Sequence, residues 1–264
     1  MVKEFKNKKE WALILGGSSG LGFATAKKLA KHGMNICIVH RNPRSHMEQV
    51  NKNFEEIVLD SVAFVSYNMD ALKLENRIEI VENLKKKLKE GKIKILVHSI
   101  AKGNLKPMVS NTNPTLKSDD FRLTIDAMGI SLYDWVKTVF ESKLFSEDAR
   151  VISFTSEGNS RAIENYAAVS AAKLTLEAIT RNIALEFACF GIRANCIQAG
   201  VTDTSSLRMI PGSDKLIKHS LERNPFNRLT LPEDVADVVY LLSKDEAAWI
   251  NGTIIPVDGG EHIN

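Results

Sequence analysis

The sequence predicts an α/β fold, a doubly wound parallel sheet of about seven strands with helices on both faces. Short runs rich in β-branched and other apolar residues alternate with longer segments of helical periodicity. No linker rich in proline, glycine or serine divides the chain, and 264 residues with 44% hydrophobic composition suffice for one large core. Repetition of strand, helix and strand brings successive strands into a parallel sheet.

The individual elements follow from this alternation. Short, mainly apolar runs predict strands at residues 11–15, 35–39, 62–66, 93–97, 150–154, 193–197 and 253–257. The longer segments between them predict helices at about residues 21–32, 72–90, 119–145, 160–189 and 232–243. We therefore expect one domain over residues 1–264, with a loop and short helix at about 205–231 near the active site.

A glycine-rich turn, Gly16-Gly17-Ser18-Ser19-Gly20-Leu21-Gly22, stands directly after the first expected strand and before an alanine-rich helix. Glycines let the backbone turn sharply and approach a pyrophosphate, which also interacts with the positive end of the following helix. The strand, turn and helix in this order predict a Rossmann-like dinucleotide site.

The end of the second expected strand favours NADPH over NADH. NAD sites generally place an acidic residue there to bind the ribose 2′-hydroxyl. This chain instead has Arg41 and Arg44, with no carboxylate before Glu48. Arginines at this position can pair with a 2′-phosphate, whereas an acid would repel it. The alternative is that both arginines only solvate a surface loop.

Composition argues against several classes of partner. The formal net charge is +3, and no block of basic residues is interleaved with aromatics, so we expect no nucleic-acid partner. No segment approaches 18 uninterrupted apolar residues, and the N-terminus lacks the apolar core of a signal peptide, so we expect a cytoplasmic protein without membrane insertion. Cys37, Cys189 and Cys196 include no Cys-x-x-Cys pair and are expected to be buried free thiols rather than metal or redox groups.

Tyr166 and Lys173 are seven residues apart in a predicted helix. Successive residues of a helix turn by roughly 100°, so seven residues return to nearly the same face. The tyrosine then lies about 10 Å along the axis from the lysine, against about 6 Å for a spacing of four. Val169 occupies the four-residue position and has no proton to donate. Tyr166 and Lys173 are therefore candidates for one catalytic site.

With these motifs in order, the chain resembles the short-chain dehydrogenase/reductase family over nearly its whole length. The glycine turn is similar to the family's Thr-Gly-x-x-x-Gly-x-Gly, with Leu15 in place of threonine. Other matching segments are Asn68-Met69, Val97-His98-Ser99-Ile100-Ala101, Ala199-Gly200-Val201-Thr202-Asp203-Thr204 and Val257-Asp258-Gly259-Gly260. The spacing Tyr-x6-Lys, in place of the usual Tyr-x-x-x-Lys, resembles the enoyl-acyl-carrier-protein reductases. Ser156 stands where the NADH-dependent members carry a further tyrosine, so the NADPH-dependent enoyl reductase III type is most similar.

The resemblance implies roles for particular side chains. Tyr166 would hydrogen-bond the thioester oxygen, Lys173 would bind the nicotinamide ribose, and Ser156 occupies the position of the family's catalytic serine. Asp126 falls where many relatives have an asparagine that supports a proton relay, and His98 is expected to be structural. The implied cofactor-binding residues are Gly16, Ser18, Ser19, Gly20, Leu21, Arg41, Asn68, Met69, Ser99, Ile100, Ala101, Lys173, Gly200, Thr202 and Thr204.

The implied reaction is NADPH-dependent reduction of the carbon–carbon double bond of a trans-2-enoyl thioester, carried by acyl-carrier protein or coenzyme A, in fatty-acid or related acyl biosynthesis. One alternative is a carbonyl or alcohol oxidoreductase, which would need an acid at Val169 or another use of Tyr166. A non-catalytic NADPH-binding protein is the third hypothesis, and intact Tyr166 and Lys173 disfavour it.

The segment at about 205–231 is expected to be mobile and to cover an acyl chain with apolar residues that include Met209, Ile210, Leu216 and Phe226. Basic residues near this entrance are candidates for contact with an acidic carrier protein: Arg208, Lys215, Lys218 and Arg223. The run of lysines at 85–89 is better explained as a solvated helix face. The resemblance also implies a homotetramer built through the helices at 119–145 and 160–189.

Overall fold

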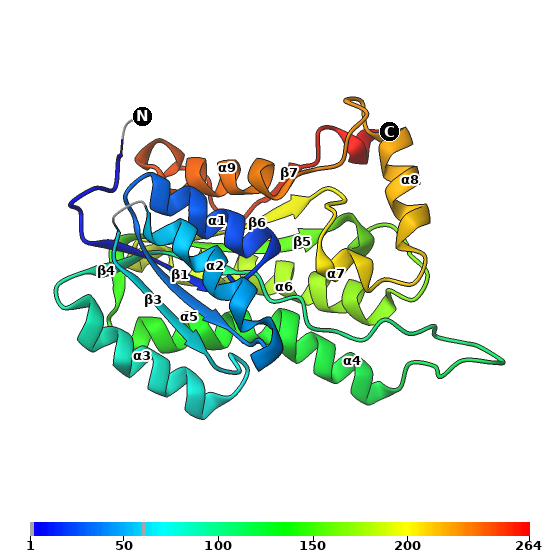
Figure 1. Ribbon diagram of the computed structural model, residues 1–264, viewed down its shortest axis with the longest axis horizontal. Coiled ribbons are helices and arrows are strands. Elements are labelled where there is room, and N and C mark those ends of the chain that lie inside the picture. Colours follow the sequence, from blue (N-terminus) through cyan, green and yellow to red (C-terminus); the bar gives the residue numbers. More distant parts are fainter. Residues whose placement is uncertain (1–2, 60–61) are drawn as a thin grey trace.

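The computed structural model describes residues 3–59 and 62–264, so residues 1, 2, 60 and 61 of the predicted domain lie outside the described residues. Its centre is a seven-stranded sheet in the order β3-β2-β1-β4-β5-β6-β7, with every neighbouring pair parallel (Figure 1). The strands are β1 (Glu10–Leu15), β2 (Asn35–His40), β3 (Phe64–Asn68), β4 (Lys92–His98), β5 (Phe145–Ser156), β6 (Ile192–Ala199) and β7 (Ile254–Val257). The predicted doubly wound α/β fold is confirmed.

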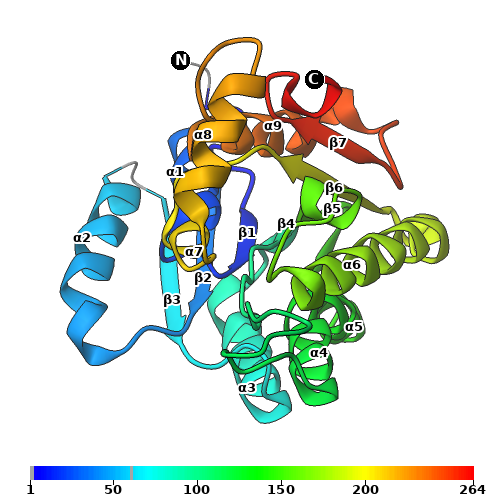
Figure 2. The same ribbon diagram turned by 90° about the vertical axis from the view of Figure 1, so that its right-hand side faces the viewer.

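Helices cover both faces of this sheet (Figure 2). One face carries α1 (Gly20–Lys31), α2 (Met47–Val58) and α9 (Pro232–Ser243). The opposite face carries α3 (Leu74–Leu88), α4 (Ser118–Ile125), α5 (Ser131–Glu141) and α6 (Ala167–Glu186). Two further helices, α7 (Ser205–Arg208) and α8 (Ser213–Arg223), follow β6 beyond the carboxyl ends of the strands (Figure 1).

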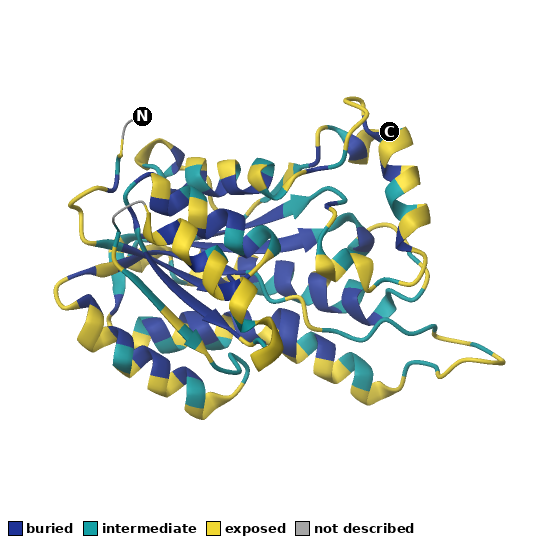
Figure 3. Ribbon diagram, in the orientation of Figure 1, coloured by how far each residue is buried: buried dark blue, intermediate teal, exposed yellow. Residues whose placement is uncertain are grey.

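The two faces of the sheet account for the nearly continuous apolar composition of its strands. In β1, Leu13 and Leu15 pack toward the layer of α3, α5 and α6, while Ala12 and Ile14 pack toward α1 and α2. All four residues are fully buried, and Figure 3 shows the central strands as buried while exposure follows the outer faces of the helices. Burial of each large aliphatic side chain contributes about 2 kcal/mol, so the sheet anchors both layers.

The prediction of one continuous helix over residues 119–145 was wrong. A single π-helical turn at Asp126–Ile130 separates α4 from α5, and Phe145 already belongs to β5. The helix interior approaches α6 closely at Gly129, where an added Cβ would lie 3.0 Å from the Thr175 side chain. Contact between these helices depends on residues far apart in sequence and was not visible in the periodicity of 119–145.

Several other boundaries differ from the predictions. The strand predicted at 62–66 begins at Phe64, and the helix predicted at 160–189 begins only at Ala167. Asn165 has a left-handed φ of 63° just before it, which redirects the chain into α6. The helix α2 was missed because most of its residues are polar, and only Val50, Phe54 and Ile57 are buried. The segment at 205–231 contains two helices rather than one.

No helix in residues 3–59 or 62–264 combines the length and the apolar composition that crossing a bilayer requires.

Candidate functional site

The glycine turn after β1 lies against the end of β4. Gly16 has φ 84°, and an added Cβ would lie 2.4 Å from the carbonyl oxygen of Ser99, so only glycine fits there. The first turn of α1 has no acidic residue, and the side chain of Ser19 at its N-cap makes no capping hydrogen bond. The positive end of this helix therefore remains available to an anion, and the turn fits the pyrophosphate of a dinucleotide.

The loop after β2 is fixed by the end of β3. The side chain of Asn68 accepts a hydrogen bond from the Asn42 backbone N–H at 2.9 Å and donates to the Asn42 carbonyl oxygen at 3.0 Å. Arg41 donates from Nη1 to Asp70 Oδ2 at 2.5 Å, yet 62% of its side chain remains exposed. A carboxylate from the neighbouring strand end thus pairs with Arg41, a contact that the local sequence of the β2 end did not predict.

Tyr166 immediately precedes α6, and its carbonyl oxygen accepts the Ser170 N–H in the helical pattern. Lys173 lies two turns further along and is 8% exposed. Its ammonium donates to the carbonyl oxygen of Phe154 at 2.7 Å, which is its one hydrogen-bond acceptor among the residues that the structure describes. An ammonium has three donors, so two remain for the hydroxyl groups of a ligand.

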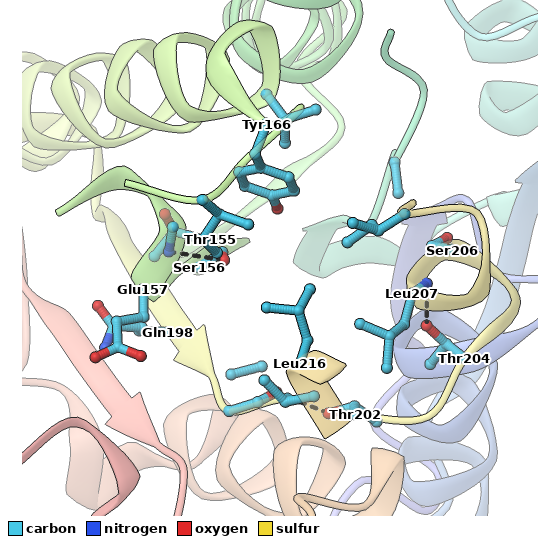
Figure 4. A pocket seen from close by; sticks show the side chains of 18 of the residues that line it. Thr155, Ser156, Glu157, Tyr166, Gln198, Thr202, Thr204, Ser206, Leu207 and Leu216 are labelled. Atoms are coloured by element: carbon cyan, nitrogen blue, oxygen red, sulfur yellow. Dashed lines mark hydrogen bonds between the residues drawn. The ribbon is translucent and has the colours of Figure 1, made fainter. Parts of the chain in front are cut away.

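A short turn at Glu157–Asn159 orients Ser156 beside the tyrosine. The Gly158 N–H donates to Ser156 Oγ at 3.1 Å, which leaves the serine hydroxyl free to donate. Burial raises the pKa of Tyr166, and the hydrogen bond with Ser156 offsets part of that rise. Gly158 also packs on the tyrosine, since an added Cβ would lie 2.6 Å from Tyr166 Cε1. In Figure 4 the Tyr166 hydroxyl points into the pocket on the side of Ser156.

The surroundings of Lys173 set the protonation of two buried groups. Burial lowers the pKa of Lys173 to about 8, and the nearby Glu177 carboxylate opposes this shift. Burial and the positive charge of Lys173 lower the pKa of His98 to about 3, so this imidazole is neutral. Its Nε2 lies 2.8 Å from Ser131 Oγ, which itself donates to the Ala127 carbonyl oxygen, so Nε2 carries the proton. His98 is therefore neutral and hydrogen-bonded through Nε2, and its structural role stays a prediction.

Tyr166, Ser156 and Gly158 border a cavity of about 230 Å³. Tyr166 and Ser156 lie on one side, and the α7–α8 segment forms the opposite wall with Leu207 and Leu216 (Figure 4). Val169 lines the same cavity, so the position four residues before Lys173 presents a methyl group rather than a proton donor. Further apolar lining residues are Leu21, Leu105, Met128, Ile163, Met209 and Ile210. The cavity suits an apolar chain that ends beside one phenol.

The predicted site residues fall into neighbouring groups. Those that line the cavity are Ser156, Tyr166, Leu21, Ala101, Gly200, Thr202 and Thr204. Thr202 Oγ1 donates to the Gly200 carbonyl oxygen, and Thr204 Oγ1 accepts the Leu207 N–H at the start of α7. Arg41, Asn68 and Met69 lie at the ends of β2 and β3, beside the glycine turn. Asp126 is exposed on the π-helical turn, and its carboxylate is not among the groups that line the cavity.

The sequence did not identify Gly158 or Glu177 as parts of the site. Glu177 is 5% exposed, and its carboxylate accepts hydrogen bonds from Thr155 Oγ1 and Asn159 Nδ2. An acidic residue one helical turn after Lys173, within a helix of mostly small and apolar residues, is the signal that could have revealed it.

The predicted carrier-contacting residues differ in their exposure. Lys215 and Lys218 are exposed, and Arg208 is paired with Asp203 and Asp214. The prediction for Arg223 was wrong, because only 12% of its side chain is exposed and its guanidinium faces the protein interior.

The cysteines and possible metal ligands add no further site in the part of the chain that the structure describes. Cys37 and Cys196 are buried and free as expected, whereas Cys189 is exposed, contrary to the prediction. Within the described ranges, no group of three or more His, Cys, Asp or Glu side chains could hold a metal ion.

Comparison with known proteins supports a nicotinamide-dependent oxidoreductase. The sequence pattern of the family described as Enoyl-(Acyl carrier protein) reductase matches residues 16–262. The 7alpha-hydroxysteroid dehydrogenase of Paraclostridium sordellii is 28% identical over 255 residues, covering 96% of this chain and 91% of that protein. The enoyl-(acyl-carrier-protein) reductase (NADPH) FabI of Staphylococcus aureus is 28% identical over 258 residues, covering 97% of each. The crystal structure of an enoyl-(acyl-carrier-protein) reductase (NADH) from Aquifex aeolicus has a TM-score of 0.82, at 23% identity and 98% coverage of both chains.

Substitution of Lys173 by methionine should remove a pH dependence of stability. The buried ammonium has its pKa lowered from 10.5 to about 8, so the folded chain loses this proton before the unfolded chain does. As the pH rises between these values, the free energy of unfolding should gain about 3 kcal/mol from this group. Urea denaturation of wild type and Lys173→Met from about pH 7 to about pH 10 measures the effect. A stability difference between the two proteins that does not change with pH would contradict the lowered pKa.

Proposed function

This chain belongs to the short-chain dehydrogenase/reductase family whose sequence pattern is described as enoyl-(acyl carrier protein) reductase, and on that premise we propose that it reduces trans-2-enoyl thioesters with NADPH. The observation that carries the proposal is the cavity in which the Tyr166 hydroxyl faces an apolar wall. Val169 also borders that cavity. It stands four residues before Lys173, where the usual Tyr-x-x-x-Lys spacing would place a proton donor. Tyr166 is then the proton donor, and the apolar wall holds the acyl chain.

Reduction of a double bond conjugated to a thioester adds a hydride to the β-carbon and a proton to the α-carbon. A bound nicotinamide supplies the hydride chemistry. Negative charge develops on the thioester oxygen, where the Tyr166 hydroxyl donates a hydrogen bond. Because burial raises the pKa of Tyr166, the phenol keeps its proton at neutral pH and is a donor rather than a base. Tyr166 then transfers that proton to the thioester oxygen, giving an enol that tautomerises, or to the α-carbon directly.

Ser156 and Lys173 prepare the tyrosine for this role. The serine hydroxyl, oriented by the Gly158 N–H, stabilises the phenolate that remains after proton transfer. The two free donors of Lys173 would bind the ribose hydroxyls of the nicotinamide half of the cofactor. At neutral pH this lysine is charged, since its pKa is about 8, and its charge also favours the phenolate.

The proposed cofactor position follows the ends of the strands. The pyrophosphate would lie on the glycine turn and the N-terminus of α1, where Ser18, Ser19 and Gly20 stand. The adenine would lie beside Asn68 and Met69. Ser99, Ile100, Gly200, Thr202 and Thr204 would hold the nicotinamide end. Arg41 is 62% exposed and would exchange its bond with Asp70 for a 2′-phosphate, which is the basis for proposing NADPH.

A carbonyl or alcohol oxidoreductase is the second candidate function. The hydrogen-bonded pair of Ser156 and Tyr166 favours it, since two hydroxyl groups together suit a single carbonyl oxygen. One relative named above is a hydroxysteroid dehydrogenase. The apolar Val169 and the spacing of seven residues between Tyr166 and Lys173 make the enoyl reductase the better-supported proposal.

We propose that the thioester is presented by acyl-carrier protein. Lys215 and Lys218 are exposed on α8 beside the cavity, where they would attract an acidic partner. The thioester could instead be carried by coenzyme A, whose phosphates are negatively charged like an acidic carrier protein.

We also propose a homotetramer, built through α4, α5 and α6. These helices and the π-helical turn between α4 and α5 carry large apolar side chains that are 40–75% exposed, a pattern that marks interaction surfaces. The residues are Leu123, Ile130, Tyr133, Leu174 and Leu185. Sedimentation velocity of the purified protein should give a species of four chains. A monomer at micromolar concentration would contradict this proposal.

Tyr166→Phe should lower kcat/KM for a crotonyl or longer trans-2-enoyl thioester by about a hundredfold or more, because it removes the proton donor. The measurement is the loss of NADPH absorbance. A matched 3-ketoacyl thioester is the comparison substrate, and unchanged NADPH binding confirms that the variant is folded. Wild-type activity with the ketone alone would overturn the proposed reaction and support the second candidate.

Arg41→Ala should reduce the preference for NADPH. Loss of the guanidinium removes a charge-assisted contact with the 2′-phosphate, so KM for NADPH should rise about tenfold while KM for NADH stays nearly constant. Initial rates with both cofactors test this, with Lys52→Ala as a control because its charge pairs with Glu48 on the exposed surface of α2. Equal changes for NADPH and NADH would contradict the assignment of Arg41.

A further inference from the structure

Arg223 ends α8, the longer of the two helices that cover the cavity. Leu216, Ser220 and Arg223 recur at helical spacing, so they share the inner face of α8. Leu216 lines the cavity, and Ser220 is 1% exposed. The guanidinium of Arg223 therefore extends from the face that holds the cavity wall.

The guanidinium of Arg223 forms ion pairs with two carboxylates, those of Glu157 and Glu261. Arg223 Nη2 donates to Glu157 Oε2 at 2.8 Å and to the backbone carbonyl oxygen of Glu261 at 2.9 Å, and it lies 3.6 Å from Glu261 Oε1. The exposed fractions of the three side chains are 12%, 24% and 5% for Arg223, Glu157 and Glu261. Ion pairs at such low exposure are weakly screened by salt. Arg161, which is 49% exposed, lies with its Nε 3.4 Å from Glu157 Oε1, so loss of Arg223 would leave Glu157 with this more exposed partner and would remove the cation between Glu157 and Glu261.

Glu157 connects this ion pair to the proposed catalytic groups. It directly follows Ser156 and precedes Gly158, which packs on the ring of Tyr166. The other end of the same turn is held by Glu177 of α6, which accepts hydrogen bonds from Thr155 and Asn159. The turn is thus held between α6, through Glu177, and α8, through Arg223.

We infer that Arg223 is a positioning residue that ties the cover helix α8 to the turn carrying Ser156 and Gly158. The ion pair fixes the distance between the wall that receives the acyl chain and the hydroxyl groups that act on the thioester. Its effect on catalysis rests on the proposed function, whereas its effect on the order of α8 does not. If Arg223 had only a structural role, its loss would lower overall stability and would not change kcat/KM for the thioester while leaving the dissociation constant for NADPH unchanged.

The test compares Arg223→Met, Arg223→Lys and Glu157→Gln with the control Glu222→Gln. Glu222 lies on the same helix, is 62% exposed and pairs only with Lys218 at 3.9 Å among the described residues, so Glu222→Gln makes the same chemical change outside the ion pair. Arg223→Met should lower kcat/KM for a coenzyme A enoyl thioester by about a hundredfold, since small displacements of reacting groups have effects of this size. The dissociation constant for NADPH should stay within about twofold of wild type, because the glycine turn and Arg41 lie on the loops after β1 and β2 and not on α8.

Glu157→Gln should have a smaller effect, about tenfold, because the amide still accepts a hydrogen bond. Arg223→Lys should recover part of the activity lost in Arg223→Met. The double variant Arg223→Met with Glu157→Gln should lose less than the sum of the single effects, since it removes the repulsion between Glu157 and Glu261.

Hydrogen exchange of the amides in residues 213–223 provides the readout that needs no substrate. Exchange in α8 should be at least about tenfold faster in Arg223→Met than in wild type, while α9 exchanges as before. Unchanged exchange in α8, or equal kinetic effects of Glu157→Gln and Glu222→Gln, would overturn the inference. If no enoyl thioester is reduced by the wild type, the proposed function fails, and faster exchange confined to α8 would still support the tie between α8 and the turn.

Discussion

Parallel pairing of the central strands is the constraint on which the site depends. Because β1, β4, β5 and β6 run in the same direction, their carboxyl ends meet at one edge of the sheet. The register pairs Leu15 with His98, and Ser156 with Ala199, so each strand delivers its following loop to the same level. One antiparallel strand among them would move its loop to the opposite edge, about 17–20 Å away. The apolar contacts of both helical layers stabilise this arrangement and so position the site.

The burial of Lys173 is an energetic cost that the surrounding structure offsets only in part. The Phe154 carbonyl oxygen satisfies one of three donors, and Glu177 supplies a compensating charge one turn away. Burial still lowers the pKa of the ammonium to about 8. Perturbed buried groups of this kind concentrate at functional sites, because a ligand can complete the contacts that the protein leaves open. Two hydroxyl groups of a ribose would be such a ligand.

The sequence predicted what depends on local pattern and missed what depends on long-range contact. The parallel sheet and its two helix layers followed from alternation, and the glycine turn from its place between a strand and a helix. The π-helical turn at Asp126–Ile130 and the late start of α6 reflect packing between helices, which periodicity does not record. Arg223 looked like an exposed base at an entrance, yet its partner Glu157 lies 66 residues away in sequence. Burial of a charged residue is decided by such distant partners.

The ion pairs of two arginines, Arg208 and Arg223, bear on how the proposed carrier protein would be attracted. Arg208 forms ion pairs with Asp203 and Asp214, which lie close to it in sequence around α7 and the start of α8. Arg223 forms ion pairs with Glu157 and Glu261, which lie outside α7 and α8. Each arginine stands between two carboxylates, so neither gives the entrance a net positive field. In the proposed function, Lys215 and Lys218, whose side chains are exposed, would attract an acidic carrier. The two arginines instead hold α7 and α8 in place through their ion pairs, and Lys215 and Lys218 are the groups through which α8 would contact a partner.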